Sequence, residues 1–425
     1  MSKTRSATET VAFVDDYCAA YRDLFSDVRS FEYFKLLHVG LISDLKRKSL
    51  PALAKAVGLD NSQGLHRFVT DGDWDLAKLR QRRLWLTKQA LAGRAFTLCI
   101  DETGDRKKGT TTDYVARQYI GNLGKIDNGI VSVNAYGVLD TITFPLTFEV
   151  FKPQKRLHDH DTYQTKPSIA ISLVKDLIAQ GFQIDLVLAD SLYGESHDLI
   201  TALNELKLSF IVAIRSNHGV WMHVGQRIRM TRWRPFTRHF SNGKTQKRWI
   251  REVIYGRRHA LRYYQMTTDP DTMPRESTQF LMTNLEGDIR ETLGDNYGIR
   301  TWIEYGFRQV KDELGWADYR VTHYEQIERW WEIVCSVYVM VSFLTRTFQR
   351  EHPVSETATT FSEHPWWSHG AGWKHMLNNL RLVAQPFVYC SLLLPWLSVV
   401  PVPGLYDGFR TLIAAMNSFR YHFPQ

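Results

Sequence analysis

The sequence predicts an α/β fold in which strands and helices alternate, with a β-rich insertion in the core and helical regions at both ends. Three observations predict this class. After residue 94, short apolar runs rich in β-branched residues alternate with helical patterns. The residues before that point carry only the 3.6-residue period of helices. Within residues 221–265, apolar and polar residues alternate as they do in antiparallel strands.

The first 92 residues form the predicted N-terminal domain. Helical periodicity runs through residues 11–25 and 31–45. Two further short helices, at residues 50–57 and 62–69, flank a turn that contains Gly58. This spacing fits a helix-turn-helix that binds DNA, and it fits equally well two packed helices with no role in DNA binding.

The alternating segments define a core in two parts, residues 93–215 and 278–325, separated by the insertion at residues 216–277. The expected strands cover residues 96–100, 130–138, 144–151, 184–189, 210–214 and 278–282. The expected helices cover residues 168–180, 197–206 and 297–314. Residues 326–425 are mostly helical and aromatic and form a C-terminal region.

Positive charge is concentrated in the insertion. The 425-residue chain has a net charge of +8 and an isoelectric point near 9.1. Residues 221–265 contain twelve Lys and Arg against the single acid Glu252, so this stretch carries +11 and the rest of the chain −3. A patch of this kind is typical of a surface that meets a polyanion such as nucleic acid.

The remaining composition points to a reducing compartment. Four scattered cysteines show neither a disulfide pattern nor the spacing of a zinc site. The first ten residues have no apolar run of the kind found in signal peptides. The most apolar stretch, residues 386–402, contains Pro395 and Pro401, so we expect buried packing there rather than a membrane span. A cytoplasmic, nucleoid-associated protein with no membrane partner is the expectation.

The predicted helix near residue 300 has a polar stripe. At 100° per residue, one sector collects a phenol, three cations and one acid, namely Tyr297, Arg300, Glu304, Arg308 and Lys311. Apolar residues occupy the opposite side. A solvated charged face is one interpretation, and a functional carboxylate among cations is the other, because exposed helices usually intersperse acids with bases.

Two aspartates follow β-like runs, Asp101 after residues 97–100 and Asp190 after residues 186–189. An aspartate at the end of a strand is often only a turn residue, although α/β folds also place chemistry there. Together with Glu304, the two would supply three hard oxygen ligands. Such a set can hold two Mg²⁺ ions roughly 3.5–4 Å apart for phosphoryl transfer. The neighbouring acids Glu102, Asp105 and Asp113 are alternative ligands.

Three ordered motifs carry a resemblance to a known family. Tyr297-x2-Arg300-x3-Glu304-x6-Lys311 matches the Y-x2-R-x3-E-x6-K signature of DDE transposases from bacterial insertion sequences. The run Asp190-Ser-Leu-Tyr-Gly194 resembles the second-aspartate motif of that superfamily, and residues 101–125 resemble its first-aspartate region. The chain is most similar to the insertion sequence seven-hundred-and-one type. The resemblance covers residues 41–324.

The resemblance implies an RNase H-like core in which Asp101, Asp190 and Glu304 bind Mg²⁺ or Mn²⁺. It implies that the cations and the tyrosine of the signature contact DNA near the cleaved phosphate, a role that includes Tyr297, Arg300 and Lys311. The neighbouring Arg308 shares their stripe and is expected to contact DNA as well.

Relatives also use an aromatic residue of the insertion to hold a flipped base while a DNA hairpin forms. The candidates for this role are Trp221, Trp233 and Trp249. A core position remains the alternative for each of them. Two other patterns carry less weight: His158-Asp-His-Asp161 lacks the spacing of a metal site, and Ser191 lacks the context of a hydrolase nucleophile.

The function predicted from these motifs is cut-and-paste transposition. The protein would bind double-stranded DNA at terminal inverted repeats, cleave the element ends and join the freed 3′-OH groups to target DNA, acting as a homodimer on paired ends. A DNA-binding protein that does not cut, and an RNase H-like nuclease without strand transfer, are the two alternatives. Joining of 3′-OH ends to target DNA distinguishes the three hypotheses.

Overall fold

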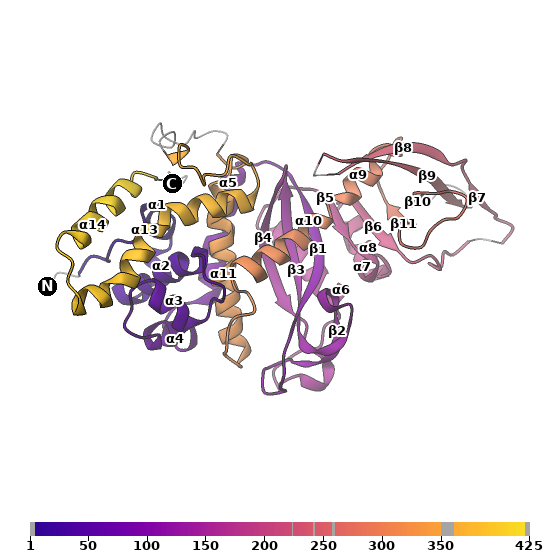
Figure 1. Ribbon diagram of the computed structural model, residues 1–425. Coiled ribbons are helices and arrows are strands. Elements are labelled where there is room, and N and C mark those ends of the chain that lie inside the picture. The colour runs from indigo at the N-terminus through magenta and orange to yellow at the C-terminus, as the bar shows by residue number, and fades with distance from the viewer. Residues whose placement is uncertain (1–4, 223, 241–242, 257–259, 350–360, 421–425) are drawn as a thin grey trace.

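The computed structural model describes residues 5–222, 224–240, 243–256, 260–349 and 361–420. Three parts follow one another along the molecule (Figure 1): a body of helices, a central sheet, and an extension of that sheet at the far end. The first and last described segments both belong to the helical body, so the chain leaves it for the sheet and returns to it.

The central sheet has five strands in the order β4-β3-β1-β5-β6. β3 pairs antiparallel with β1 and β4, whereas β1, β5 and β6 run parallel to one another. Parallel neighbours require crossover helices, and α6 and α8 provide them. Thr165 caps α6 and Ser196 caps α8 through side-chain oxygens that accept backbone N–H groups. The bounds of these elements are β1 Phe96–Arg106, β3 Lys125–Leu139, β4 Ile142–Val150, α6 Lys166–Ala179, β5 Ile184–Ala189, α8 His197–Glu205 and β6 Phe210–Ile214.

The same sheet continues beyond β6 into the strands of residues 216–283. β11 pairs antiparallel with β6, and β10, β9 and β7 follow outward, with β8 beside β9. The predicted strands of the insertion are confirmed, but they form one continuous sheet with the core. β2 was not predicted, because its five residues are mostly polar and only Ile120 is buried. The bounds are β2 Ala116–Ile120, β7 Ile228–Met230, β8 Arg234–His239, β9 Thr245–Tyr255, β10 Arg262–Thr267 and β11 Gln279–Thr283.

The helices from the two ends of the chain form one body. α11, which is buried along most of its length, packs against α2 and α5 and against β4 of the sheet. Hydrogen bonds join Ser336 of α11 to Tyr17 and to His38. The bounds are α1 Ala12–Ala19, α2 Val28–Ile42, α3 Leu50–Ala56, α4 Gln63–Thr70, α5 Leu76–Leu91, α11 Tyr324–Phe343, α13 Trp373–Val399 and α14 Leu405–Met416.

The prediction of one regular helix at residues 297–314 is wrong, although the backbone stays helical through most of this range. The structure has α9 (Leu293–Gly298), α10 (Thr301–Arg308) and a wider π-type turn, η4 (Gln309–Glu313). Two glycines weaken helix formation in α9. At Gly298 the chain passes so close to Arg238 that an added Cβ would lie 2.8 Å from a guanidinium nitrogen. The polar stripe therefore does not lie along one straight helix.

The predicted burial of residues 386–402 is also wrong. α13 continues through Pro386 and Pro395, and Trp396 and Val399 in its second half are 68% and 74% exposed. The reason is that this half packs mainly on α14 and borders α3 across a pocket, which leaves much of its surface uncovered. Within the described residues, α13 is the one helix whose length and composition would suffice to cross a membrane.

A buried ion pair holds the helical body on the sheet. Arg83 of α5 and Glu332 of α11 are both fully buried and form an ion pair, and Arg80 approaches the same carboxylate at 3.1 Å. Arg83 also donates to the carbonyls of Pro145 and Leu146 on β4, at 2.9 and 3.0 Å. Burial alone would raise the pKa of Glu332, but Arg83 and Arg80 hold this pKa below its usual value.

We predict that Glu332→Ala lowers the free energy of unfolding by about 3–5 kcal/mol, because it leaves the buried guanidinium of Arg83 without a counter-charge. Urea unfolding at pH 7 measures this. Asp23→Ala, which breaks the exposed pair with Arg82, is the control and should cost under about 1 kcal/mol. Since the pKa of Glu332 is depressed by folding, its contribution is present above its unfolded pKa and is lost as pH falls below that value. Equal losses for both variants would contradict the prediction.

Candidate active site

Parallel pairing of β1 with β5 brings the two predicted aspartates together. Ile100 of β1 is in register with Ala189 of β5. The residues that follow them, Asp101 and Asp190, therefore lie side by side. β5 ends there, and Asp190 caps the short helix α7 (Ser191–Gly194) by accepting a hydrogen bond from the Leu192 N–H at 2.8 Å. β1 continues to Arg106, so Asp101 stands within a strand rather than at its end. This position makes Asp101 more than a turn residue.

The pKa of Asp101 shows how closely charges are packed here. Burial raises this pKa from its usual value to about 7, Arg300 opposes the rise, and the neighbouring Asp190 adds to it. A carboxyl group in this state takes up or releases a proton near neutral pH. Perturbed carboxylates of this kind are common at functional sites.

Residues of α9 and α10 complete the group. The Arg300 guanidinium donates from Nη1 to Asp101 Oδ2 at 2.7 Å and from Nη2 to Glu304 Oε1 at 3.1 Å. Tyr297 is buried beside them: burial raises its pKa to about 12, with Arg300 opposing and the two aspartates adding to the rise. The structure thus brings Asp101, Asp190, Tyr297, Arg300 and Glu304 into one neighbourhood, although Glu304 reaches Asp101 only through Arg300.

The oxygen donors of this group suit a hard divalent cation. In the described part of the chain, however, no three His, Cys, Asp or Glu side chains lie close enough together to hold a metal ion. The guanidinium of Arg300 stands between Asp101 and Glu304 and compensates their charge. The side chain of Glu304 is 48% exposed, and a cation shared by all three acids would require Arg300 to leave its place between Asp101 and Glu304.

The other two cations of the predicted stripe lie elsewhere. Lys311, in η4, donates to the Gly104 carbonyl at 2.8 Å and pairs with the buried Asp105 at 2.9 Å. Arg308 stacks on the ring of Tyr305 at 4.5 Å. The π-type turn changes the direction in which Lys311 projects, and Arg308, one turn after Glu304 on α10, lies outside the group that surrounds Asp101.

The alternative acids have other partners. Glu102 projects from the opposite face of β1 and pairs with Lys166 at 2.7 Å. Asp105 binds Lys311, and Asp113 accepts the Tyr324 N–H at 2.8 Å. Asp161, the last residue of the His158-Asp-His-Asp161 run, is bound by Lys152, Tyr114 and the His158 N–H. Asp101 is therefore the acid of this segment that meets Asp190 and Arg300.

Comparison with known proteins decides the family. The family model described as "DDE superfamily endonuclease" matches residues 23–269. A relative from Microchaete diplosiphon, "Probable transposase for insertion sequence element IS701", is 56% identical over 329 residues, which cover 77% of this chain and 87% of the relative. The chain belongs to the IS701-type DDE transposases.

Membership in this superfamily implies dependence on a divalent metal ion and DNA as the substrate. The segment matched by the family model includes Asp101 and Asp190 and ends before Tyr297. In the structure, Arg300 links Glu304 to Asp101. This supports grouping Glu304 with the two aspartates, and it does not depend on the family model.

The three tryptophans proposed for base holding in this transposase lie in the sheet extension. Trp221 is 96% exposed, so the core alternative is wrong for it. Trp233 and Trp249 are half-buried, and each stacks on a cation: Arg251 lies 4.3 Å from the ring centre of Trp233, and Lys247 lies 5.1 Å from that of Trp249. Their role in DNA binding stays a prediction.

Sequence reasoning assigned no role to Tyr193. Its hydroxyl is fully buried without a hydrogen-bond partner, and its pKa is well above the usual value because of burial and the nearby charges of Glu102, Asp101 and Asp190. The spacing Asp190-x2-Tyr193, which spans the single turn of α7, is the signal that could have identified it.

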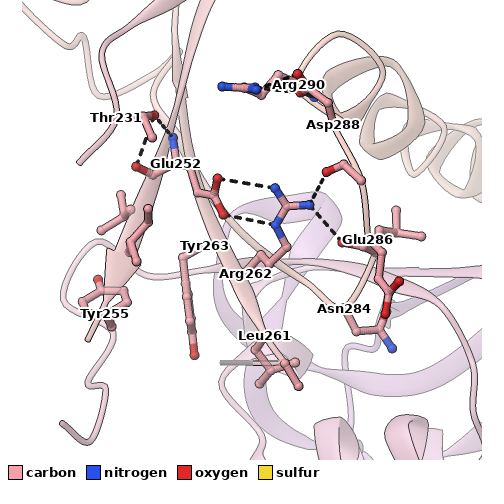
Figure 2. Close-up of a pocket in the computed structure, with 15 residues that line it drawn as sticks. Thr231, Glu252, Tyr255, Leu261, Arg262, Tyr263, Asn284, Glu286, Asp288 and Arg290 are labelled. Carbon is pink, nitrogen blue, oxygen red and sulfur yellow. Dashed lines mark hydrogen bonds and ion pairs between the residues drawn. The ribbon is translucent and has the colours of Figure 1, made fainter. Parts of the chain in front are cut away.

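A separate pocket of about 590 Å³ opens in the sheet extension (Figure 2). Its charged groups are partnered internally: Arg262 binds Glu252 at 3.1 Å and the Gly287 carbonyl at 2.6 Å, and Arg290 binds Asp288. Arg262 is in register with Thr283, at the end of β11 beside the start of β6. The pocket therefore lies at the edge of the sheet opposite Asp101 and Asp190, and it is not part of the candidate active site.

We predict that Arg300→Ala raises the pKa of Asp101 further above about 7 in the metal-free transposase, because the guanidinium is the cation that opposes its protonation. Titration of ¹³C-labelled aspartate carboxyls by NMR measures the shift, with Asp101→Asn identifying the resonance. Arg308→Ala removes the same charge from the same helix and should leave the resonance nearly unmoved. An unchanged pKa in Arg300→Ala would show that the pair does not form in solution.

Proposed function

We propose that this transposase moves DNA by a cut-and-paste reaction in which Asp101, Asp190 and Glu304 form the catalytic triad. The observation that carries the proposal is the meeting of Asp101 and Asp190 at the carboxyl end of β5, with Arg300 joining Asp101 to Glu304. The strand order β4-β3-β1-β5-β6, with β3 antiparallel, supports an RNase H-like core, and the insertion enters between Asp190 and Glu304 as β7 to β10.

The triad would hold Mg²⁺, as two ions for which Mn²⁺ can substitute. When bound, the ions would activate the attacking oxygen of water or a 3′-OH and stabilise the leaving oxygen. The chain's own residues supply the remaining functions. Arg300 would leave the carboxylates to bind a DNA phosphate, and the hydroxyl of Tyr297 would orient it. Arg308 and Lys311 are proposed to contact the DNA backbone nearby, Lys311 after exchanging Asp105 for phosphate.

The DNA partners are the terminal inverted repeats and the target duplex. In the N-terminal helices, α4 exposes Gln63, His66 and Arg67 on one side, which supports a helix-turn-helix formed with α3. Trp221, Trp233 and Trp249 are proposed base-holding residues if the second strand is cut through a hairpin.

We further propose that the transposase acts as a homodimer on paired ends. The exposed apolar half of α13 supports this, because large uncovered apolar surfaces commonly mark protein contacts. Association with the nucleoid follows from DNA binding. A repressor that binds without cutting would not need the clustered carboxylates, and a plain nuclease would not need the basic sheet extension.

Cleavage and strand transfer test the proposal. On labelled element-end DNA with Mg²⁺, the wild-type protein should cut and join, whereas Glu304→Ala should bind the DNA but neither cut nor join, with activity lower by at least about 10³-fold. Binding without cutting by both proteins would favour a regulatory protein. Cutting by the variant would exclude Glu304 as the third ligand.

Metal binding should also depend on pH. A ligand must be deprotonated, and the pKa of Asp101 is about 7, so the affinity for Mn²⁺ should rise about tenfold between pH 6 and pH 8 and level off above that. Electron paramagnetic resonance of free Mn²⁺ measures it. Glu102→Gln, which alters the opposite face of β1, should shift this profile only slightly to lower pH, because Glu102 is the weakest of the groups that raise the pKa of Asp101, and Asp101→Asn should abolish binding. Retained binding in Asp101→Asn would remove Asp101 from the ligand set.

A further inference from the structure

Two arginines of the sheet extension are buried without an acidic partner. Arg238 of β8 and Arg248 of β9 are 8% and 9% exposed. Phe236 is in register with Arg248, and Arg238 with Gln246, so the two arginines are diagonal neighbours on one face of the sheet. Within the described residues, no ion pair includes either side chain.

Several of their donors are unused. The Nε atom of Arg238 and the Nη1 atom of Arg248 are buried and have no hydrogen-bond partner. Arg248 donates only from Nε, to the Gln246 side chain at 3.1 Å, and the Arg238 guanidinium stacks on Phe240 at 4.7 Å. The nearest acid, Asp295, is already engaged by His239 through its N–H and its ring, at 2.8 and 3.0 Å.

This arrangement is unfavourable for the protein alone. Burial lowers the pKa of both guanidinium groups. Asp295 and Tyr297 oppose this shift at Arg238, whereas the charge of Arg238 lowers the pKa of Arg248 further. The contrast with Arg83 is direct, because that buried arginine has Glu332 as its counter-charge. Two adjacent buried cations with free donors are stabilised when an anion with several acceptor oxygens joins them.

The pair also lies near the candidate active site. Phe236 and Ile250, each two residues away from one of the arginines, belong to the apolar cluster that contains Tyr297 and Cys99. Asp101 is two residues beyond Cys99, so it faces the same side of the sheet. Arg238 lies against Gly298 and within electrostatic reach of Tyr297, whose hydroxyl is close to Asp190 and Asp101.

We propose that Arg238 and Arg248 form a binding site for one backbone phosphate of the DNA, near the phosphate that meets Asp101 and Asp190. The inference rests on the proposed function, since it requires DNA at the active site. It adds two residues that no motif identifies, and it gives the basic extension a defined contact. A DNA strand held at Arg300 and again at this arginine pair would be fixed in position across Asp101 and Asp190.

The experiment scans element-end duplexes that carry a single methylphosphonate, which removes the charge of one phosphate at a time. For the wild-type protein, neutralising the phosphate at this site should weaken binding about tenfold. The double variant Arg238→Gln/Arg248→Gln should be insensitive at that phosphate and unchanged at the others. Its plot of log affinity against log salt concentration should also lose about one unit of slope.

Arg229→Gln is the matched control. Arg229 lies on β7, is exposed, and donates to the Gly256 carbonyl at 3.2 Å. This variant should keep sensitivity at the critical phosphate. Arg238→Lys/Arg248→Lys keeps both charges and should restore part of the effect, which covers the case in which the glutamine variant does not fold.

Two results would overturn the inference: an unchanged scan in the double variant, or a uniform loss at every phosphate. The proposed function has a separate readout, because failure of the wild-type protein to bind or cut element-end DNA would contradict it before any variant is compared. A scan in which the wild-type protein cuts but no single phosphate depends on the arginine pair would remove only the phosphate site.

Discussion

The parallel pairing of β1 with β5 is the constraint on which the rest of the structure depends. It is the contact that places Asp101 beside Asp190, although the two residues are far apart in the sequence. Parallel strands need a crossover, which explains α6, and β3 must lie antiparallel on the other side of β1. α10 then covers the face toward which Asp101 points, and this brings Glu304 to the same edge.

Clustered acids require cations, and the distribution of arginines follows from that need. Arg300 lies between Asp101 and Glu304 and compensates their charge, so the carboxylates are stabilised in the absence of metal ions and DNA. Arg83 serves a different purpose, since its pairing with Glu332 is permanent and joins the helical body to the sheet. Among the described residues, Arg238 and Arg248 form no ion pair and keep buried donors unpaired, which is why they point to a ligand rather than to stability.

Local sequence patterns predicted the features of the fold that depend on residues close together in the sequence. The strand at β5, the crossover helices and the strands around the insertion lie where periodicity placed them, as does Asp190 at the end of β5, whereas Asp101 lies inside the longer β1. The errors concern long-range contacts. The turn after α9 lies against Arg238 of another strand, Lys311 turns to Asp105 on β1, and the second half of α13 is exposed because few other elements cover it. Charge counting found the basic extension but could not show which arginines are buried.

The central claim is that Asp101, Asp190 and Glu304 converge on divalent metal ions once DNA displaces Arg300. Anomalous X-ray diffraction from crystals of the transposase with element-end DNA and Mn²⁺ tests it most directly. The account predicts anomalous peaks about 2.0–2.2 Å from carboxylate oxygens of all three residues, with the Arg300 guanidinium moved onto a phosphate. Peaks coordinated by Glu102 or Asp105 in place of Asp101, or Arg300 still bridging Asp101 and Glu304 beside bound metal, would contradict it.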